Sequence, residues 1–531
     1  MVGGPRAPLI DNRAADAVGA IGSEGGHRGL ARLSLSTRDE GALNAALACA
    51  DAVDHFHLDV ARTRCGDAVA KDDALALAHL WLAQSLASPE AAGAELAKAE
   101  VRAANSSRAE RLFVDGWRAR KEGRAAQARR AYDELVQILD GEPRAFAARG
   151  QLRLEGGDVD GAVADFERAA ALDEKYAAAQ NLLGFALAER GQQELAVAAL
   201  RKYVQMMPQE PNAHDSLALV LLRGGDAVGA AAEARKALAV DGKFVVAHGT
   251  LGDALLAEGK LKDARKEYGV LAAADDATLR HDGAMRAARS YFLEEKWTDG
   301  ERALIKEGDV ARRARRSLEA TDAFLEAARS QLERGALAEA GRGISEAIVS
   351  LQPVEGEVAA PGTPLDEHER RQLKARLVEA RAQALALLRE RQLAEVRADE
   401  LEAQLAALGD GRADERVRGL RGWMAWKNGD AKAAKAGLDK AQAPTLRLAY
   451  AQVLVEEGDK AKARAIVEEL AKRSGNDLET ALSRPRAQAM LRALGKAPKD
   501  EEAREAKDAK ETTKAGKDGD DGEGKDAKDA K

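Results

Sequence analysis

The stretch that decides the fold is residues 181–211, NLLGFALAERGQQELAVAALRKYVQMMPQEP. In this stretch Gly184 is followed seven positions later by Gly191, and Ala196 comes five positions after that. Glycine adopts positive φ readily, so Gly191 is predicted to end one helix and allow the chain to reverse. The small residues before and after the turn let the two helices approach closely. Pro211 is well placed to begin the next helix.

The same pattern recurs every 34 residues between residues 109 and 278. Three columns of residues carry it: the turn glycines Gly123, Gly157, Gly191, Gly225 and Gly259; the alanines Ala128, Ala162, Ala196, Ala230 and Ala264; and the small residues Gly116, Gly150, Gly184, Ala218 and Gly252. Tyr132, Phe166, Leu200 and Tyr268 are the larger apolar residues that fill the space toward the next unit, and Ala234 is the exception. A 34-residue unit accommodates two helices and two turns. The spacing therefore predicts five antiparallel helix pairs and no strand in this span.

The residues Leu183-Gly184, Leu187, Ala196, Leu200 and Pro208 resemble the signature of the tetratricopeptide repeat (TPR). The segment from Asn181 to Ala247 is similar to a widespread group of bacterial TPR proteins. This resemblance implies an all-α protein, an α-solenoid in which TPR helix pairs form a right-handed superhelix. It also implies a non-catalytic scaffold that binds a protein or peptide ligand in a concave groove lined by the first helix of each pair.

Composition and weaker repeats extend this pattern into a division of the whole chain. We expect a flexible segment at 1–37, divergent TPR-like pairs at 38–108, five regular units at 109–278, degenerate TPR-like helices at 279–351, a linker at 352–366, TPR-like helix pairs at 367–495, and a disordered charged tail at 496–531. In the tail, lysine, aspartate, glutamate, alanine and glycine leave too little apolar surface to offset the entropy of ordering.

Two arrangements are open for residues 367–408, where Leu373, Ala380, Leu387 and Leu401 follow a seven-residue repeat. A single long helix with this repeat would form a coiled coil and make the chain a self-associating structural protein. A helical hairpin that turns near Arg391 fits the repeat architecture better.

The overall charge and hydropathy exclude several partners. Lysine and arginine number 82 against 89 aspartates and glutamates, a net charge of −7, which does not favour nucleic acid. No apolar run is long enough for a membrane span. Residues 1–37 contain no signal peptide pattern, which indicates the cytoplasm, or the periplasm if the true start lies upstream. Cys49 and Cys65 fall on the two helices of one divergent unit and could face each other, although buried thiols are the expectation.

Motifs for chemistry are missing. The sequence has no phosphate-binding glycine loop, no H-E-x-x-H and no G-x-S-x-G, so we expect no enzyme, no cofactor and no metal site; an unrecognised active site within 279–495 is the remaining enzymatic alternative. His55 and His57 are two apart, which places them on different helix faces. The cluster Arg312, Arg313, Arg315 and Arg316 is either a solvated helix face or a docking patch for an acidic partner.

In the TPR family the second, fifth and ninth positions of each first helix face the groove. Carried onto this sequence, those positions give a candidate peptide-binding set of Trp117, Arg144, Gln151, Asn181, Phe185, Asn212, Asp215 and Asp253. Aromatic anchors together with polar groups suit an extended peptide. Trp117 and Phe185 could instead simply pack against neighbouring helices.

Overall fold

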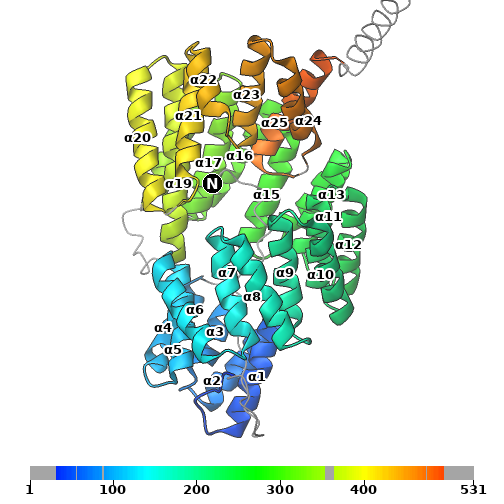
Figure 1. Ribbon diagram of the computed structural model, residues 1–531, viewed down its shortest axis with the longest axis vertical. Coiled ribbons are helices and arrows are strands. Elements are labelled where there is room, and N and C mark those ends of the chain that lie inside the picture. Colours follow the sequence, from blue (N-terminus) through cyan, green and yellow to red (C-terminus); the bar gives the residue numbers. More distant parts are fainter. Residues whose placement is uncertain are drawn as a thin grey trace, which may run out of the picture.

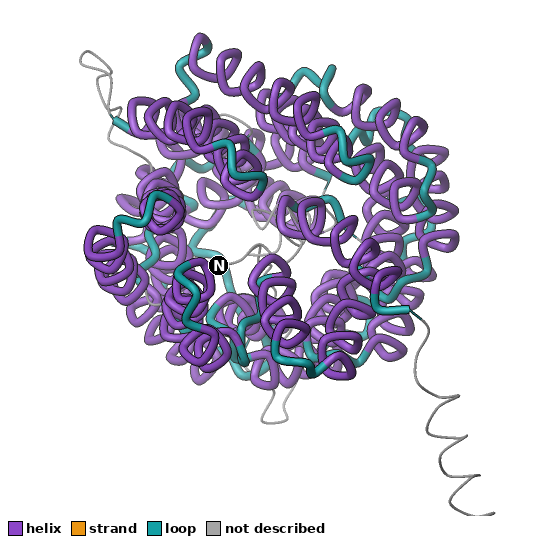
Figure 2. The backbone as a smooth tube through the Cα atoms, turned by 90° about the horizontal axis from the view of Figure 1, so that it is seen from above, coloured by secondary structure: helices purple, strands orange, loops and turns teal. Residues whose placement is uncertain are grey.

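The computed structural model describes residues 32–54, 57–86, 89–352, 364–408, 410–473 and 475–495. Within these ranges all regular structure is helical, in 25 helices without a strand. The helices stand in antiparallel pairs (Figure 1), and viewed from above the pairs follow one another around a central region (Figure 2). The chain is therefore an α-solenoid of helix pairs. Residues 1–31 and the expected tail at 496–531 lie outside the described residues.

Five pairs occupy the span in which the 34-residue pattern is regular. They are α5 (Arg108–Lys121) and α6 (Ala125–Ile138), α7 (Pro143–Glu155) and α8 (Val159–Leu172), α9 (Ala177–Glu189) and α10 (Gln193–Met206), α11 (Pro211–Arg223) and α12 (Ala227–Val240), and α13 (Val246–Ala257) and α14 (Leu261–Leu271). In each pair the predicted glycine lies in the turn, with φ between 70° at Gly123 and 88° at Gly225. The predicted turns are thus confirmed. Further on, where the glycine is missing, Glu295 and Arg315 adopt φ of 58° instead.

The two helices of a pair touch through one small residue and one large one. A Cβ atom added to Gly116, Gly150 or Gly184 would lie within 3.0 Å of Tyr132, Phe166 or Leu200 respectively. Each large residue stands sixteen positions after its small partner. In the fourth pair the same spacing places Ala234 opposite Ala218. Here alanine takes the place of glycine on the first helix, and a small alanine takes the place of the large residue on the second.

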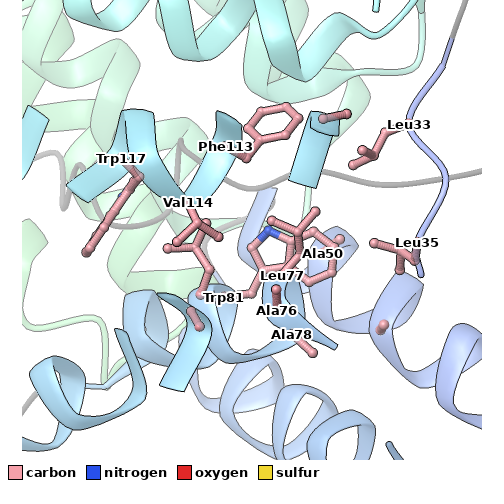
Figure 3. Close-up of a cluster of buried hydrophobic side chains, with 14 of the residues drawn as sticks. Leu33, Leu35, Ala50, Ala76, Leu77, Ala78, Trp81, Phe113, Val114 and Trp117 are labelled. Carbon is pink, nitrogen blue, oxygen red and sulfur yellow. The ribbon is translucent and has the colours of Figure 1, made fainter. Parts of the chain in front are cut away.

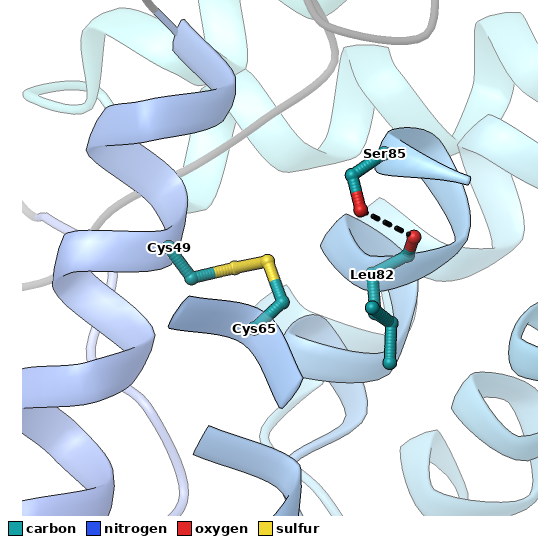
Figure 4. The surroundings of a disulfide bond; sticks show 4 residues. All are labelled: Cys49, Cys65, Leu82 and Ser85. Carbon is teal, nitrogen blue, oxygen red and sulfur yellow. Dashed lines mark hydrogen bonds between the residues drawn. A yellow bond between two sulfur atoms is a disulfide. The ribbon is translucent and has the colours of Figure 1, made fainter. Parts of the chain in front are cut away.

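Two further pairs precede this array. They are α1 (Glu40–Asp54) with α2 (Leu58–Lys71) and α3 (Ala76–Ser85) with α4 (Pro89–Ala103). Cys49 on α1 and Cys65 on α2 form a disulfide, with their Cα atoms 4.8 Å apart (Figure 4). The expectation of two buried thiols is therefore wrong. The two positions are also sixteen apart, so they occupy the close-contact register of the central pairs, which brings the sulfur atoms together.

The C-terminal part continues the pairing. Its helices are α15 (Ala277–Phe292), α16 (Trp297–Arg313), α17 (Ser317–Glu333), α18 (Leu337–Leu351), α19 (Pro364–Leu387), α20 (Arg391–Ala407), α21 (Ala413–Lys427), α22 (Ala431–Leu438), α23 (Pro444–Glu456), α24 (Lys460–Lys472) and α25 (Leu478–Ala493). Between α19 and α20 the chain reverses at 388–390, where Arg389 has φ of 66°. Residues 367–408 are thus a hairpin and not one long helix. Helix α19 already begins inside the expected linker at 352–366, of which residues 353–363 lie outside the described ranges.

The direction of curvature follows from the contacts between pairs. In most of the stack the first helices of successive pairs pack directly on one another, as in α7 with α9, α9 with α11 and α11 with α13. Comparable contacts between successive second helices are not made in the described chain. The stack therefore bends toward its first helices, and we call the side that they line the inner face.

Both ends of the described chain fold back onto first helices. Helix α25 packs against α15 and α17, with Leu478 and Leu482 buried among Met285, Phe292 and their neighbours. At the other end, Leu33 and Leu35 are buried, 0% and 9% exposed, in the cluster that contains Phe113 (Figure 3). Residues 32–37 therefore differ from the expectation that 1–37 forms a flexible segment.

Candidate functional site

The candidate site is a row of three polar side chains on consecutive first helices: Gln151 on α7, Asn181 on α9 and Asp215 on α11. Below they are called the inner row. Asn181 and Asp215 occupy equivalent positions, 34 residues apart, and Gln151 lies one turn further along the helix of the preceding unit. Because first helices of neighbouring pairs pack together, these positions follow one another along the inner face.

The inner row is buried, and most of its polar side-chain atoms lack hydrogen bonds. Gln151, Asn181 and Asp215 are 4%, 0% and 3% exposed. Both amide atoms of Gln151, both amide atoms of Asn181, and Oδ1 of Asp215 have no hydrogen-bond partner within the protein. A buried polar group without a partner costs about 1–3 kcal/mol, so such groups are rare and call for an explanation. Five buried donor and acceptor atoms on three neighbouring helices therefore have no hydrogen-bond partner within the described chain.

Asp215 is the ionisable residue of the inner row. Burial raises the pKa of its carboxyl to about 6, against which the Thr250 hydroxyl and the positive charge of Arg286 favour the ionised form. Asp215 consequently changes charge near pH 6. A cation brought beside it would stabilise the carboxylate.

Three of the other sequence-predicted site residues already have polar partners within the chain. The Arg144 guanidinium donates to Asp54 Oδ2 at 2.6 Å and lies over the Tyr176 ring. The amide of Asn212 donates to the Tyr203 hydroxyl at 3.3 Å.

Asp253 is likewise satisfied, because the Tyr268 hydroxyl donates to its Oδ1 at 2.7 Å and Arg286 pairs with Oδ2. Trp117 and Phe185 are buried among apolar neighbours, and the Lys121 ammonium lies 5.3 Å from the centre of the Trp117 ring. The structure thus separates the eight predicted residues into the inner row and five that pack or pair internally.

Sequence reasoning missed three buried glutamates at the beginning of first helices: Glu110, Glu142 and Glu210. Glu142 accepts a hydrogen bond from the Leu33 amide at 3.4 Å, and Glu110 from the Ser36 amide at 3.1 Å. Glu210 pairs with His57. A signal was present in the sequence, since Glu142 and Glu210 both precede a proline at equivalent places, but that pattern indicates only helix capping.

The arginine cluster lies partly in internal ion pairs. Arg312 pairs with Asp309 and Glu346, and Arg316 donates to the Ala277 carbonyl oxygen and to Glu319. Arg313 and Arg315 are exposed.

No group of three or more histidine, cysteine, aspartate or glutamate side chains within the described residues could hold a metal ion, and His55 lies outside them. A cavity of about 430 Å³ between α20, α21 and α22 is lined by charged residues such as Arg391, Glu395 and Arg421, and its described lining contains no serine, cysteine or histidine. Among the described helices, none is both long and apolar enough to cross a membrane.

Comparison with known proteins gives structural neighbours only. No family model matches the chain, and no curated protein matches it significantly. Among solved structures, it is similar to MamA from Desulfovibrio magneticus (21% identity, 31% of this chain and 92% of that chain, TM-score 0.27), PilF of Pseudomonas aeruginosa (19%, 40% and 96%, 0.31) and a thermophilic TPR protein of Thermus thermophilus (24%, 32% and 93%, 0.29).

The type of repeat is assigned from the geometry of the chain itself. Its 34-residue helix pairs, positive-φ turn residues and small-to-large contacts are those expected of the TPR signature at residues 183–208. The protein is therefore an array of helix pairs whose geometry resembles that of tetratricopeptide repeats.

Proposed function

We propose that this chain is a non-catalytic scaffold that binds an extended segment of a partner protein along the inner row. The observation that carries the proposal is the set of unpaired buried atoms on Gln151, Asn181 and Asp215. The amide of an asparagine or glutamine both donates and accepts, so it can pair with the N–H and C=O groups of a peptide backbone. Two such amides followed by a carboxylate suit an extended peptide with a basic residue at one end.

The alternative of self-association through residues 367–408 has less support. The residues of the seven-residue repeat are used inside the molecule, because Leu373 and Leu401 are buried and Ala380 packs in the cluster around Phe324. A hairpin whose apolar faces are covered by its own neighbours has little left to form a coiled coil.

The cysteine pair bears on the compartment. Disulfides persist in oxidising environments and are rare in the cytosol, where thiols are kept reduced. The bond between Cys49 and Cys65 therefore supports the periplasm over the cytoplasm as the place where this chain works.

The test is selection of peptides from a displayed random library on the full chain, followed by titration of a selected peptide. Asn181→Ala and Gln151→Ala should each weaken binding by about tenfold or more, since about 1.4 kcal/mol of hydrogen bonding is lost. The matched control is Gln205→Ala, an exposed glutamine on α10 in the same unit as Asn181.

The same titration has a pH dependence. A basic peptide should bind more tightly as pH rises through about 6, because the Asp215 carboxyl then loses its proton, and Asp215→Asn should remove that dependence. Selected peptides that bind Asn181→Ala and Gln151→Ala as tightly as the wild type would place the binding surface elsewhere.

A further inference from the structure

One segment of the chain is seated on first helices in the manner of a bound peptide. Residues 32–37 form no helix or strand, and side chains are alternately exposed and buried from Arg32 to Ser36. That alternation is what an extended peptide lying on a surface shows. The two buried members are Leu33 and Leu35.

The segment crosses consecutive pairs in order. The Ser36 hydroxyl and amide both donate to Glu110 near the start of α5. The Leu33 amide donates to Glu142 at the start of α7, and the Arg32 guanidinium donates to the Leu172 carbonyl oxygen, 3.3 Å away, at the end of α8. Followed backward from Ser36, the chain therefore runs toward α9, which carries Asn181.

Two buried carboxylates bind the segment along this path. Glu110 and Glu142 are almost fully buried, and burial raises the pKa of the Glu142 carboxyl against the opposing effects of Arg144 and the Leu33 amide. Each carboxylate accepts from backbone amides of the segment, which any peptide can supply. Specificity comes instead from the leucines, which enter the cluster around Phe113 and Trp81 (Figure 3).

We propose that Arg32–Thr37 is an intramolecular ligand of this surface, and that the partner of the scaffold replaces it with a segment of the same chemistry. Such a segment has two apolar side chains two residues apart, a hydroxyl next to the second, and a basic residue ahead of the first. Helix α7 begins after Glu142 and also carries Gln151 of the inner row, so one extended peptide that follows α7 can contact both surfaces. This extension rests on the proposed function, whereas occupation of the surface on α5 and α7 does not.

The experiment uses the full chain and a fluorescent synthetic peptide of sequence RLSLSTR, which copies residues 32–38. In the wild type the attached segment competes, so only the small open fraction can bind the probe. Leu33→Ser/Leu35→Ser should free the surface and tighten binding of the probe by about tenfold or more. Ser36→Ala, which keeps both leucines, should give a smaller increase in the same direction.

Two controls fix the site. Adding Glu110→Gln and Glu142→Gln to the leucine variant should abolish the gain, and a probe with serine in place of both leucines should bind none of the chains. Equal affinity for wild type and the leucine variant would overturn the proposal. Loss of the helical circular dichroism signal in the leucine variant would also overturn it, because the segment would then be part of the core. The probe involves no outside partner, so this result is independent of the library selection.

Discussion

In the five central helix pairs, a small residue on the first helix faces the residue sixteen positions later on the second, and this contact sets the spacing of the two helices. Where the first is Gly184, the second is Leu200, and the space for a Cβ is filled by the leucine. Where the first is Ala218, the second is Ala234, and both are fully buried. The sizes of the residues at the two positions vary together from pair to pair, because the backbones of the two helices must stay at the same distance from each other.

A double-mutant cycle tests this matching. Ala234→Leu should destabilise the chain by about 1–3 kcal/mol, since the leucine meets the Cβ of Ala218 in a packed interface. Ala218→Gly alone should also destabilise, by about 1 kcal/mol, through helix propensity. Combined, the changes recreate the arrangement of Gly184 and Leu200, so the double variant should be more stable than the sum of the two by about 1 kcal/mol or more.

Urea denaturation followed by circular dichroism measures all three free energies of unfolding. If the free-energy changes of the two single variants add up to that of the double variant, the proposed matching of residue sizes is wrong. The sequence alone shows both columns of residues and marks Ala234 as unusual, but it does not show which small residue each large one faces. The same limit applies to the site: the register selects Arg144 and Asp253, and only the fold reveals that Asp54, 90 positions away, and Arg286, 33 positions away, already pair with them.

At the scale of elements, the α1–α2 pair uses the same register with different chemistry. Cys49 and Cys65 stand where other pairs have a small and a large residue, and a covalent bond replaces the packing contact. The helix positions from α5 to α14 could be predicted because turn glycines and contact residues recur at a fixed interval. In α1 and α2 two small cysteines fit that register as thiols or as a disulfide, and the sequence-based expectation of buried thiols was wrong because spacing alone does not show that the sulfur atoms meet.

Removing the bond should weaken this end of the chain. Cys49→Ala/Cys65→Ala should lower the free energy of unfolding by about 3 kcal/mol, the chain-entropy estimate for a loop of this length, with a sequence separation of 16. A reducing agent should shift the wild type by a similar amount and leave the double variant unchanged. A wild-type midpoint insensitive to reduction would show that the bond contributes nothing.

At the scale of the whole molecule, contacts far apart in sequence fold both ends of the described chain onto first helices. Asn476, just before α25, donates to the Arg286 carbonyl oxygen 190 positions away, and Leu33 donates to Glu142 across 109 positions. Such contacts leave no period in the sequence, so repeat analysis predicts the pairs and not where the stack ends. Glu479 lies at the centre of the C-terminal closure.

Glu479 joins three helices through one buried carboxylate. It pairs with Arg329 on α17 and accepts hydrogen bonds from the amide and hydroxyl of Thr445 on α23. Burial alone would favour the protonated form, yet Arg329 and Thr445 hold the pKa of Glu479 below its usual value. The carboxylate therefore stabilises the closure above the usual pKa of glutamate, and this contribution is lost as pH falls through the lowered value.

Glu479→Ala should consequently cost about 3–5 kcal/mol, because it leaves the Arg329 charge buried without its partner. Replacing both residues with methionine should cost much less, since no charge then remains buried. Small-angle X-ray scattering should show a larger radius of gyration for Glu479→Ala if α25 leaves α15 and α17. Glu134→Ala, which removes an exposed ion pair with Arg108, is the control and should change neither the midpoint nor the radius. A Glu479→Ala chain with the wild-type radius and midpoint would mean that the apolar contacts of Leu478 and Leu482 hold α25 in place without the ion pair.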